Sequence, residues 1–83
     1  MNNKVIVHIY VPVLEIDFEA KIPINKRINQ VMYLIQKYIV TIDKNYPVND
    51  DHILCDRRSG QIHDPNDIVV DSNIRNGSQL IVY

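Results

Sequence analysis

Residues 21–42, KIPINKRINQVMYLIQKYIVTI, contain the one sustained helical period of the chain. Apolar residues recur there at steps of three and four, which predicts a single amphipathic helix. Its predicted inner stripe is Ile28, Val31, Met32, Ile35, Tyr38, Ile39 and Ile42, and its predicted outer side is Asn29, Gln30, Tyr33, Gln36 and Lys37. Asn25 is the candidate N-cap. Because isoleucine and valine lower helix propensity, this helix needs a sheet to pack against.

Two strands are predicted before the helix. Lys4 to Val11, KVIVHIYV, is β-branched and almost continuously apolar, which is typical of a central strand. The residues predicted to face away from the helix are Ile6, His8 and Tyr10. Glu15 to Ile22 alternates apolar and charged residues, which predicts a half-buried strand. Its charged, outward set is Glu15, Asp17, Glu19 and Lys21.

The second half of the chain predicts shorter strands joined by polar turns. They are His52 to Asp56, a stub at Gln61-Ile62, and Gln79 to Tyr83. Residues 63–76 have no helical period and contain Pro65, so a ferredoxin-like sandwich, which needs a second helix, is the weaker alternative. The order of elements predicts an α+β fold of the β-grasp type. One helix packs across a mixed sheet of four to five strands, and the last strand lies parallel to the first.

The composition indicates an ordinary globular domain. Eighty-three residues allow one core, so residues 1–83 are expected to form a single domain. A net charge of −1 gives no basic surface for nucleic acid. No signal peptide and no apolar run of about 18 residues is present, so we expect a cytoplasmic protein without direct membrane insertion.

Few residues could carry chemistry. His52 and Cys55 form the one close pair of metal-ligand type, with His8 and His63 far from it, whereas structural zinc uses two such pairs. A chain with two glycines has no phosphate-binding loop. Cys55 has Arg57 on the same side of its strand, but no arrangement of cysteine, histidine and aspartate or asparagine can be placed around it. We therefore predict no metal, no cofactor and no enzymatic activity.

The surface of the sheet that faces away from the helix is the remaining candidate site. The candidate protein-binding residues are Ile6, His8, Leu54, Ile81 and Tyr83. Apolar side chains gathered on an exposed face mark binding sites, and the charged set of the second strand would flank them. The alternative is that these are ordinary isolated surface residues, and a phase error of one residue would move a side chain into the core.

The chain resembles ubiquitin-like proteins over essentially its whole length. This resemblance rests on Leu54 and the Gly60-Gln61-Ile62 stub, on Asp71-Ser72-Asn73-Ile74, and on Leu80-Ile81-Val82. Two motifs carry a closer resemblance: Ile22-Pro23-Ile24 before the helix, and the pattern from Asp71 through Ile74 and Asn76-Gly77 to Leu80. Within that superfamily the chain is most similar to the bacterial YukD/EsaB family of type VII secretion accessory proteins. The resemblance implies an adaptor that binds a protein through the open side of its sheet, with a membrane component of the secretion apparatus as the candidate partner.

The sequence ends at Tyr83, directly after the last predicted strand and without a Gly-Gly tail. Conjugated ubiquitin-like proteins need such a tail, so we expect a protein that is not conjugated. The alternative function is a general β-grasp interaction module of a signalling, toxin or phage system that binds by pairing with a sheet edge. Whether the protein is a monomer or a dimer is left open by the sequence.

Overall fold

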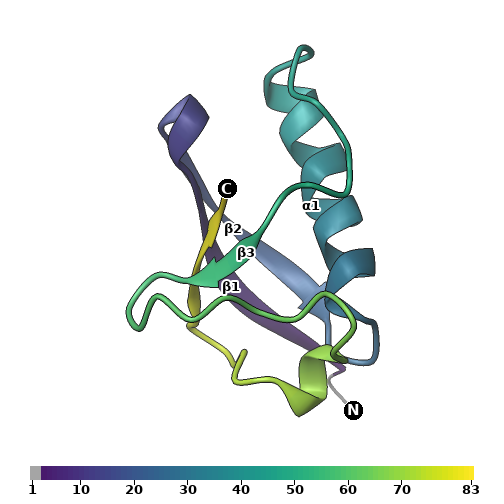
Figure 1. Ribbon diagram of the computed structural model, residues 1–83. Helices are drawn as coiled ribbons and strands as arrows, with labels where there is room; N and C mark the ends of the chain where they lie inside the picture. Colours follow the sequence, from purple (N-terminus) through teal and green to yellow (C-terminus); the bar gives the residue numbers. More distant parts are fainter. Residues whose placement is uncertain (1–2) are drawn as a thin grey trace.

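One helix packs across a four-stranded mixed sheet in the computed structural model, which describes residues 3–83 (Figure 1). The elements are β1 (Lys4–Val11), β2 (Ile16–Pro23), α1 (Ile28–Ile42), β3 (Leu54–Asp56) and β4 (Gln79–Val82). The strand order is β2-β1-β4-β3, with β1 antiparallel to β2 and parallel to β4. This is the predicted β-grasp arrangement, and the parallel pairing of the first and last strands is confirmed.

The β1–β2 hairpin is closed by a short 3₁₀ turn, Pro12–Leu14. Glu15 follows in the left-handed conformation with φ of 53°, and its N–H donates to the Pro12 carbonyl at 3.1 Å. A non-glycine residue rarely adopts this conformation, so the paired strands hold it there. The ladder runs without interruption from Lys4 opposite Pro23 to Val11 opposite Ile16, which fixes the face of every side chain in both strands.

The core lies between the sheet and α1. Its fully enclosed side chains are Val7, Ile9, Val11, Ile28, Val31, Ile39, Val69, Ile74, Leu80 and Val82. The period of two predicts that Val5, Val7, Ile9 and Val11 of β1 and Leu80 and Val82 of β4 point inward, and all of these except the partly buried Val5 are fully enclosed. Apolar burial of this kind is the main source of stability for such a small domain.

The helix begins later than predicted. Asn25 was the expected N-cap, but Arg27 occupies that position, and its N–H donates to the Gln30 side chain at 3.0 Å. The N–H groups of Ile28 and Asn29 donate to carbonyls of the segment 65–67, at 2.8 and 2.9 Å. Since the first free donors of the helix are satisfied by a distant segment, a local capping residue is not needed at Asn25.

The inner stripe of α1 is rotated from the prediction. Tyr38 and Ile42 were expected inside but are half-exposed, whereas Gln36 was expected outside and is buried. The loop after α1 runs back beside the helix (Figure 1), and the Asn49 N–H donates to the Gln36 side chain at 2.9 Å. Tyr38 instead packs against Phe18 of β2, with ring centroids 4.8 Å apart. Helical periodicity could not predict the burial of Gln36, because that burial depends on the position of a loop in the folded protein.

The second half of the chain is mostly irregular. The strand expected at 52–56 is observed as β3, and the stub at Gln61-Ile62 is observed as a single bridge between Cys55 and Ile62. Residues 63–76 contain one short 3₁₀ turn, Val69–Asp71, and no α-helix. Within residues 3–83, no helix has both the length and the hydropathy that a membrane span requires.

Candidate functional site

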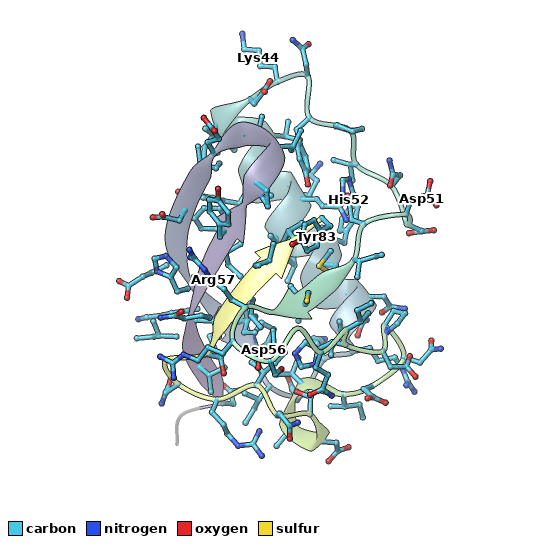
Figure 2. All side chains as sticks on the ribbon, turned by 60° about the vertical axis from the view of Figure 1, so that its left-hand side comes forward. Lys44, Asp51, His52, Asp56, Arg57 and Tyr83 are labelled. Carbon is cyan, nitrogen blue, oxygen red and sulfur yellow. The ribbon has the colours of Figure 1, made fainter. Side chains whose placement is uncertain are left out.

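The side of the sheet opposite α1 is called the open face below. It carries the even-numbered residues of β1 and the odd-numbered residues of β2 and β4. Residues that are paired directly across strands point to the same side. The pairs therefore place Asp17, Tyr10, Ile81 and Cys55 in one row across the four strands. Figure 2 shows the labelled Arg57 and Tyr83 on this side, with α1 behind the sheet.

Four of the five predicted binding residues lie on the open face. Ile6 and Tyr83 are exposed, by 45% and 60%, while His8 and Ile81 are half-buried. They do not form one apolar patch. Ile6 lies four residues before Tyr10, the partner of Ile81, which is a separation of about 13 Å along a strand. The apolar part of the face is thus concentrated at the Tyr10 end of β1.

The prediction for Leu54 was wrong. Its side chain is 2% exposed and belongs to the core, because it pairs with Val82, which points inward. Cys55, one residue later, pairs with Ile81 and has the phase that was expected of Leu54. Three consecutive apolar residues at 53–55 give no alternation, so the sequence could not fix the phase of this short strand.

An arginine completes the apolar end of the open face. The Arg57 guanidinium lies over the Tyr10 ring, 5.0 Å from its centroid, which is a cation–π contact. The Arg57 N–H donates to the Gln79 carbonyl at 2.9 Å, which attaches the residue to β4. Sequence reasoning placed Arg57 on the same face as Cys55, but the partner ring comes from a distant strand and could not be found.

The turn after β3 positions this arginine. The Asp56 carboxylate accepts hydrogen bonds from the Arg58 N–H at 3.2 Å and the Ser59 hydroxyl at 2.9 Å, and these bonds lower the pKa of Asp56. The Gly60 N–H donates to the Asp56 carbonyl at 2.9 Å. Gly60 has φ of +77°, a conformation that glycine adopts freely and in which a side chain would be strained.

Charged groups of β1 and β2 flank the apolar end of the open face. The His8 ring nitrogen lies 3.6 Å from the Asp17 carboxylate across the β1–β2 pair. Glu19 and Lys21 follow on β2 and are exposed. The pair is open to water, so it contributes little to stability, but charges at the rim of a binding surface select partners.

Tyr83 is anchored through its main chain. The His52 ring lies between two main-chain oxygens: Nδ1 is 2.9 Å from the Tyr83 oxygen and Nε2 is 2.8 Å from the Pro47 oxygen. The ring also stacks on Tyr46 at 5.0 Å between centroids. Burial raises the pKa of Tyr46. The exposed Tyr83 ring is therefore presented from an ordered backbone.

The other reactive groups are dispersed. Cys55 is almost fully buried, and its thiol contacts the Asp56 carbonyl at 3.5 Å. His8 is on β1, His52 holds the oxygens of Pro47 and Tyr83, and His63 is next to β3. Within residues 3–83, no three histidine, cysteine, aspartate or glutamate side chains are placed to hold a metal ion. The absence of enzymatic activity stays a prediction.

No family model and no curated protein matches this sequence. Among solved structures, the N-terminal ubiquitin-like domain of the 4931431F19Rik protein has a TM-score of 0.77 at 20% identity, covering 100% of this chain and 76% of that one. A chain of the ESX-5 inner membrane complex has a TM-score of 0.77 at 11% identity, covering 99% and 21%. A chain of the toluene 4-monooxygenase HD complex with 4-bromobenzoate has a TM-score of 0.79 at 14% identity, covering 95% of each.

These structures place the chain in a fold class. The order of its strands, its single helix and the match to ubiquitin-like domains define a ubiquitin-like β-grasp fold. The similar structures come from proteins with very different descriptions. The fold by itself therefore assigns no activity.

Proposed function

We propose that this chain is a cytoplasmic protein-binding adaptor, and that it is an accessory component of a type VII secretion system. The observation that carries the binding role is the arrangement on the open face, where Arg57 covers Tyr10 beside Ile81. Arginine and tyrosine are enriched in the energetic centres of protein interfaces. Since β1, β4 and the hydrogen-bonded turn after β3 supply this surface, little ordering is needed when a partner binds.

Two observations support the secretion role. The sequence resembles the YukD/EsaB family in the segment before α1 and in the segment that leads into β4. A chain of the ESX-5 inner membrane complex contains a domain of the same fold. The protein described here matches about a fifth of the length of that ESX-5 chain. The proposed partner is therefore a membrane component of the secretion apparatus.

The test is affinity capture from the solubilised membranes of the native host. Wild-type protein is compared with Ile81→Asp and Arg57→Glu, which alter the open face. Matched controls are Leu34→Asp, which places the same charge on an exposed position of α1, and Arg58→Glu, which reverses the neighbouring arginine. Circular dichroism first establishes that every variant is folded.

A type VII component identified by mass spectrometry should be retained by wild type and both controls. It should be lost from Ile81→Asp and Arg57→Glu, because both changes place a negative charge in the apolar end of the face. Retention of that component by the two open-face variants would show that the open face is not its site. Capture of soluble proteins alone would reject the secretion role.

The free edge of β2 favours a second candidate function, pairing with a strand of another protein. The outer side of β3 is occupied, since the Asp56 N–H donates to the Gln61 carbonyl at 2.8 Å and the His63 N–H to the Leu54 carbonyl at 2.9 Å. In contrast, β2 is the outermost strand on its side of the sheet. An interaction module of this kind would add a peptide strand there.

The direction of the hydrogen bonds makes this alternative testable. The His8 N–H donates to Ser78, toward β4, so the even-numbered residues of β1 bond to β4 and the odd-numbered ones to β2. By the register, the main-chain groups of Glu19, the partner of His8, point to the free edge, and those of Ala20 point to β1.

Glu19→Pro should block edge pairing while the protein stays folded. Ala20→Pro should destabilise the hairpin, because it removes a hydrogen bond of the β1–β2 ladder. Unchanged partner binding by Glu19→Pro would exclude the β2 edge.

A further inference from the structure

A hollow, called the cleft below, lies between α1 and the segments on either side of β3, and its volume is about 720 Å³. Tyr33 of α1, Val48 and Ile53 before β3, and Ile62 after it are among the residues that line it. All four are exposed, and Ile62 is the most open at 64%. The open face has two exposed apolar side chains, Ile6 and Tyr83, so more exposed apolar residues gather at the cleft than at the face. Such a concentration marks a binding surface.

The cleft contains a buried polar group with an unused hydrogen-bonding capacity. His63 lines the cleft and is 6% exposed. Its main-chain N–H donates to the Leu54 carbonyl at 2.9 Å. Its ring forms no hydrogen bond with the residues that the structure describes. Among the same residues, every fully enclosed side-chain nitrogen or oxygen has a hydrogen-bond partner. Because the ring nitrogens of His63 have no partner, they are not fully enclosed and can be reached by a ligand. A ligand in the cleft can therefore form the missing hydrogen bond.

The charged side chains that line the cleft are acidic, and the cations nearby, Lys37 and Arg27, contact its margin at Tyr33 and Asn66. Asp50 and Asp51 are among its lining residues, and no lysine or arginine is. Asp56 and Asp67 add negative potential around His63, although burial is the larger influence and lowers the pKa of this histidine. A neutral imidazole in a negative, partly apolar hollow is complementary to a ligand that is both apolar and cationic.

We propose that the cleft binds a short extended segment of a partner protein in which an aliphatic or aromatic side chain is next to a lysine or arginine. The apolar side chain packs against Ile53 and Ile62, and the cation lies beside Asp50 and Asp51. A polar group of the segment hydrogen-bonds to His63. The site is separate from the Tyr10–Arg57 arrangement, so it does not depend on the secretion role.

The experiment uses phage-displayed random heptapeptides, which are selected on the immobilised full chain. Enriched sequences are synthesised, and their affinities are measured by fluorescence polarisation. Ile62→Asn removes an apolar wall of the cleft, and Ile42→Asn, at an exposed position on the last turn of α1, is its control. The double variant Asp50→Asn/Asp51→Asn removes the charge, and its control is Asp71→Asn, at an exposed position that does not line the cleft.

The enriched peptides should combine an apolar residue with an adjacent lysine or arginine. They should bind Ile62→Asn at least about tenfold more weakly than wild type. They should bind the double aspartate variant several-fold more weakly, with a reduced salt dependence. Both controls and Ile81→Asp should bind as wild type does.

The proposal is overturned if no peptide is enriched, if enriched peptides lack the basic residue, or if they bind Ile62→Asn unchanged. Loss of binding in Ile81→Asp would assign the peptides to the open face instead.

Discussion

Leu54 and Ile62 lie on neighbouring segments at the edge of the sheet, but only the first is enclosed by the core. Leu54→Ala would leave a cavity and should lower the free energy of unfolding by about 2–5 kcal/mol. Ile62→Ala, on a side chain that is mostly in water, should change it by less than about 0.5 kcal/mol. Urea denaturation of both variants measures the difference. Equal effects would contradict the burial of Leu54.

His63 should make stability depend on pH. Burial lowers its pKa in the folded protein below the ordinary value of 6.5, so the unfolded chain takes up a proton first as the pH falls. The free energy of unfolding should therefore be highest above pH 6.5 and should decrease as the pH falls toward the folded-state pKa. Urea denaturation from about pH 8 to about pH 5 tests this.

The histidine variants provide the control for that measurement. His63→Gln should remove this part of the pH dependence, whereas His8→Gln, on the open face, should keep it. The aspartates near His63 partly offset the effect of burial, because their negative charges favour the protonated ring. A wild-type profile that coincides with that of His63→Gln would show that this histidine does not contribute.

At the scale of elements, His52 joins the loop after α1 to the end of β4. His52→Ala removes the contacts with the Pro47 and Tyr83 oxygens and the stack on Tyr46. Stability should fall by about 1–3 kcal/mol, and amide exchange should accelerate at Ile53 and Tyr83, whose main chains pair with each other. Hydrogen exchange followed by NMR measures this. Faster exchange in the β1–β2 hairpin alone would contradict a local role for His52.

The elements differ in how far sequence alone could define them. The β1 bounds and the parallel β1–β4 pair were predictable, because continuous apolar strands must lie at the centre of a sheet. The start of α1 was not, because the N–H groups of Ile28 and Asn29 bond to a segment almost forty positions away. The burial of Gln36 depends in the same way on Asn49 of the returning loop.

The candidate site was predictable where strands alternate. The period of two placed Ile6, His8 and Ile81 on the open face. The unbroken apolar run that includes Leu54 did not show which of its residues face the core. The contact between Arg57 and Tyr10 and the cleft beside α1 could not be foreseen. Both bring together segments whose distance in space is fixed only by the complete fold.

For the whole molecule, the central position of β4 makes folding dependent on the last described residues. Deletion of residues 79–83 would remove the partner of both β1 and β3, and the chain should lose its cooperative unfolding transition. Insertion of two glycines after Lys44, in an exposed loop, should preserve that transition and lower stability only slightly. Thermal unfolding followed by circular dichroism distinguishes the two variants. A cooperative transition in the shortened chain would show that the remaining strands form a sheet without β4.

The parallel pairing of β1 and β4 also determines how the domain responds to mechanical force. The start of β1 and the end of β4 lie at opposite ends of the sheet (Figure 1). Tension applied through Lys4 and Val82 would act along the strands in shear. It would load the bonds between β1 and the segment 77–82 together, instead of opening them one after another. A domain loaded in this direction should resist pulling better than one whose strands are peeled apart bond by bond.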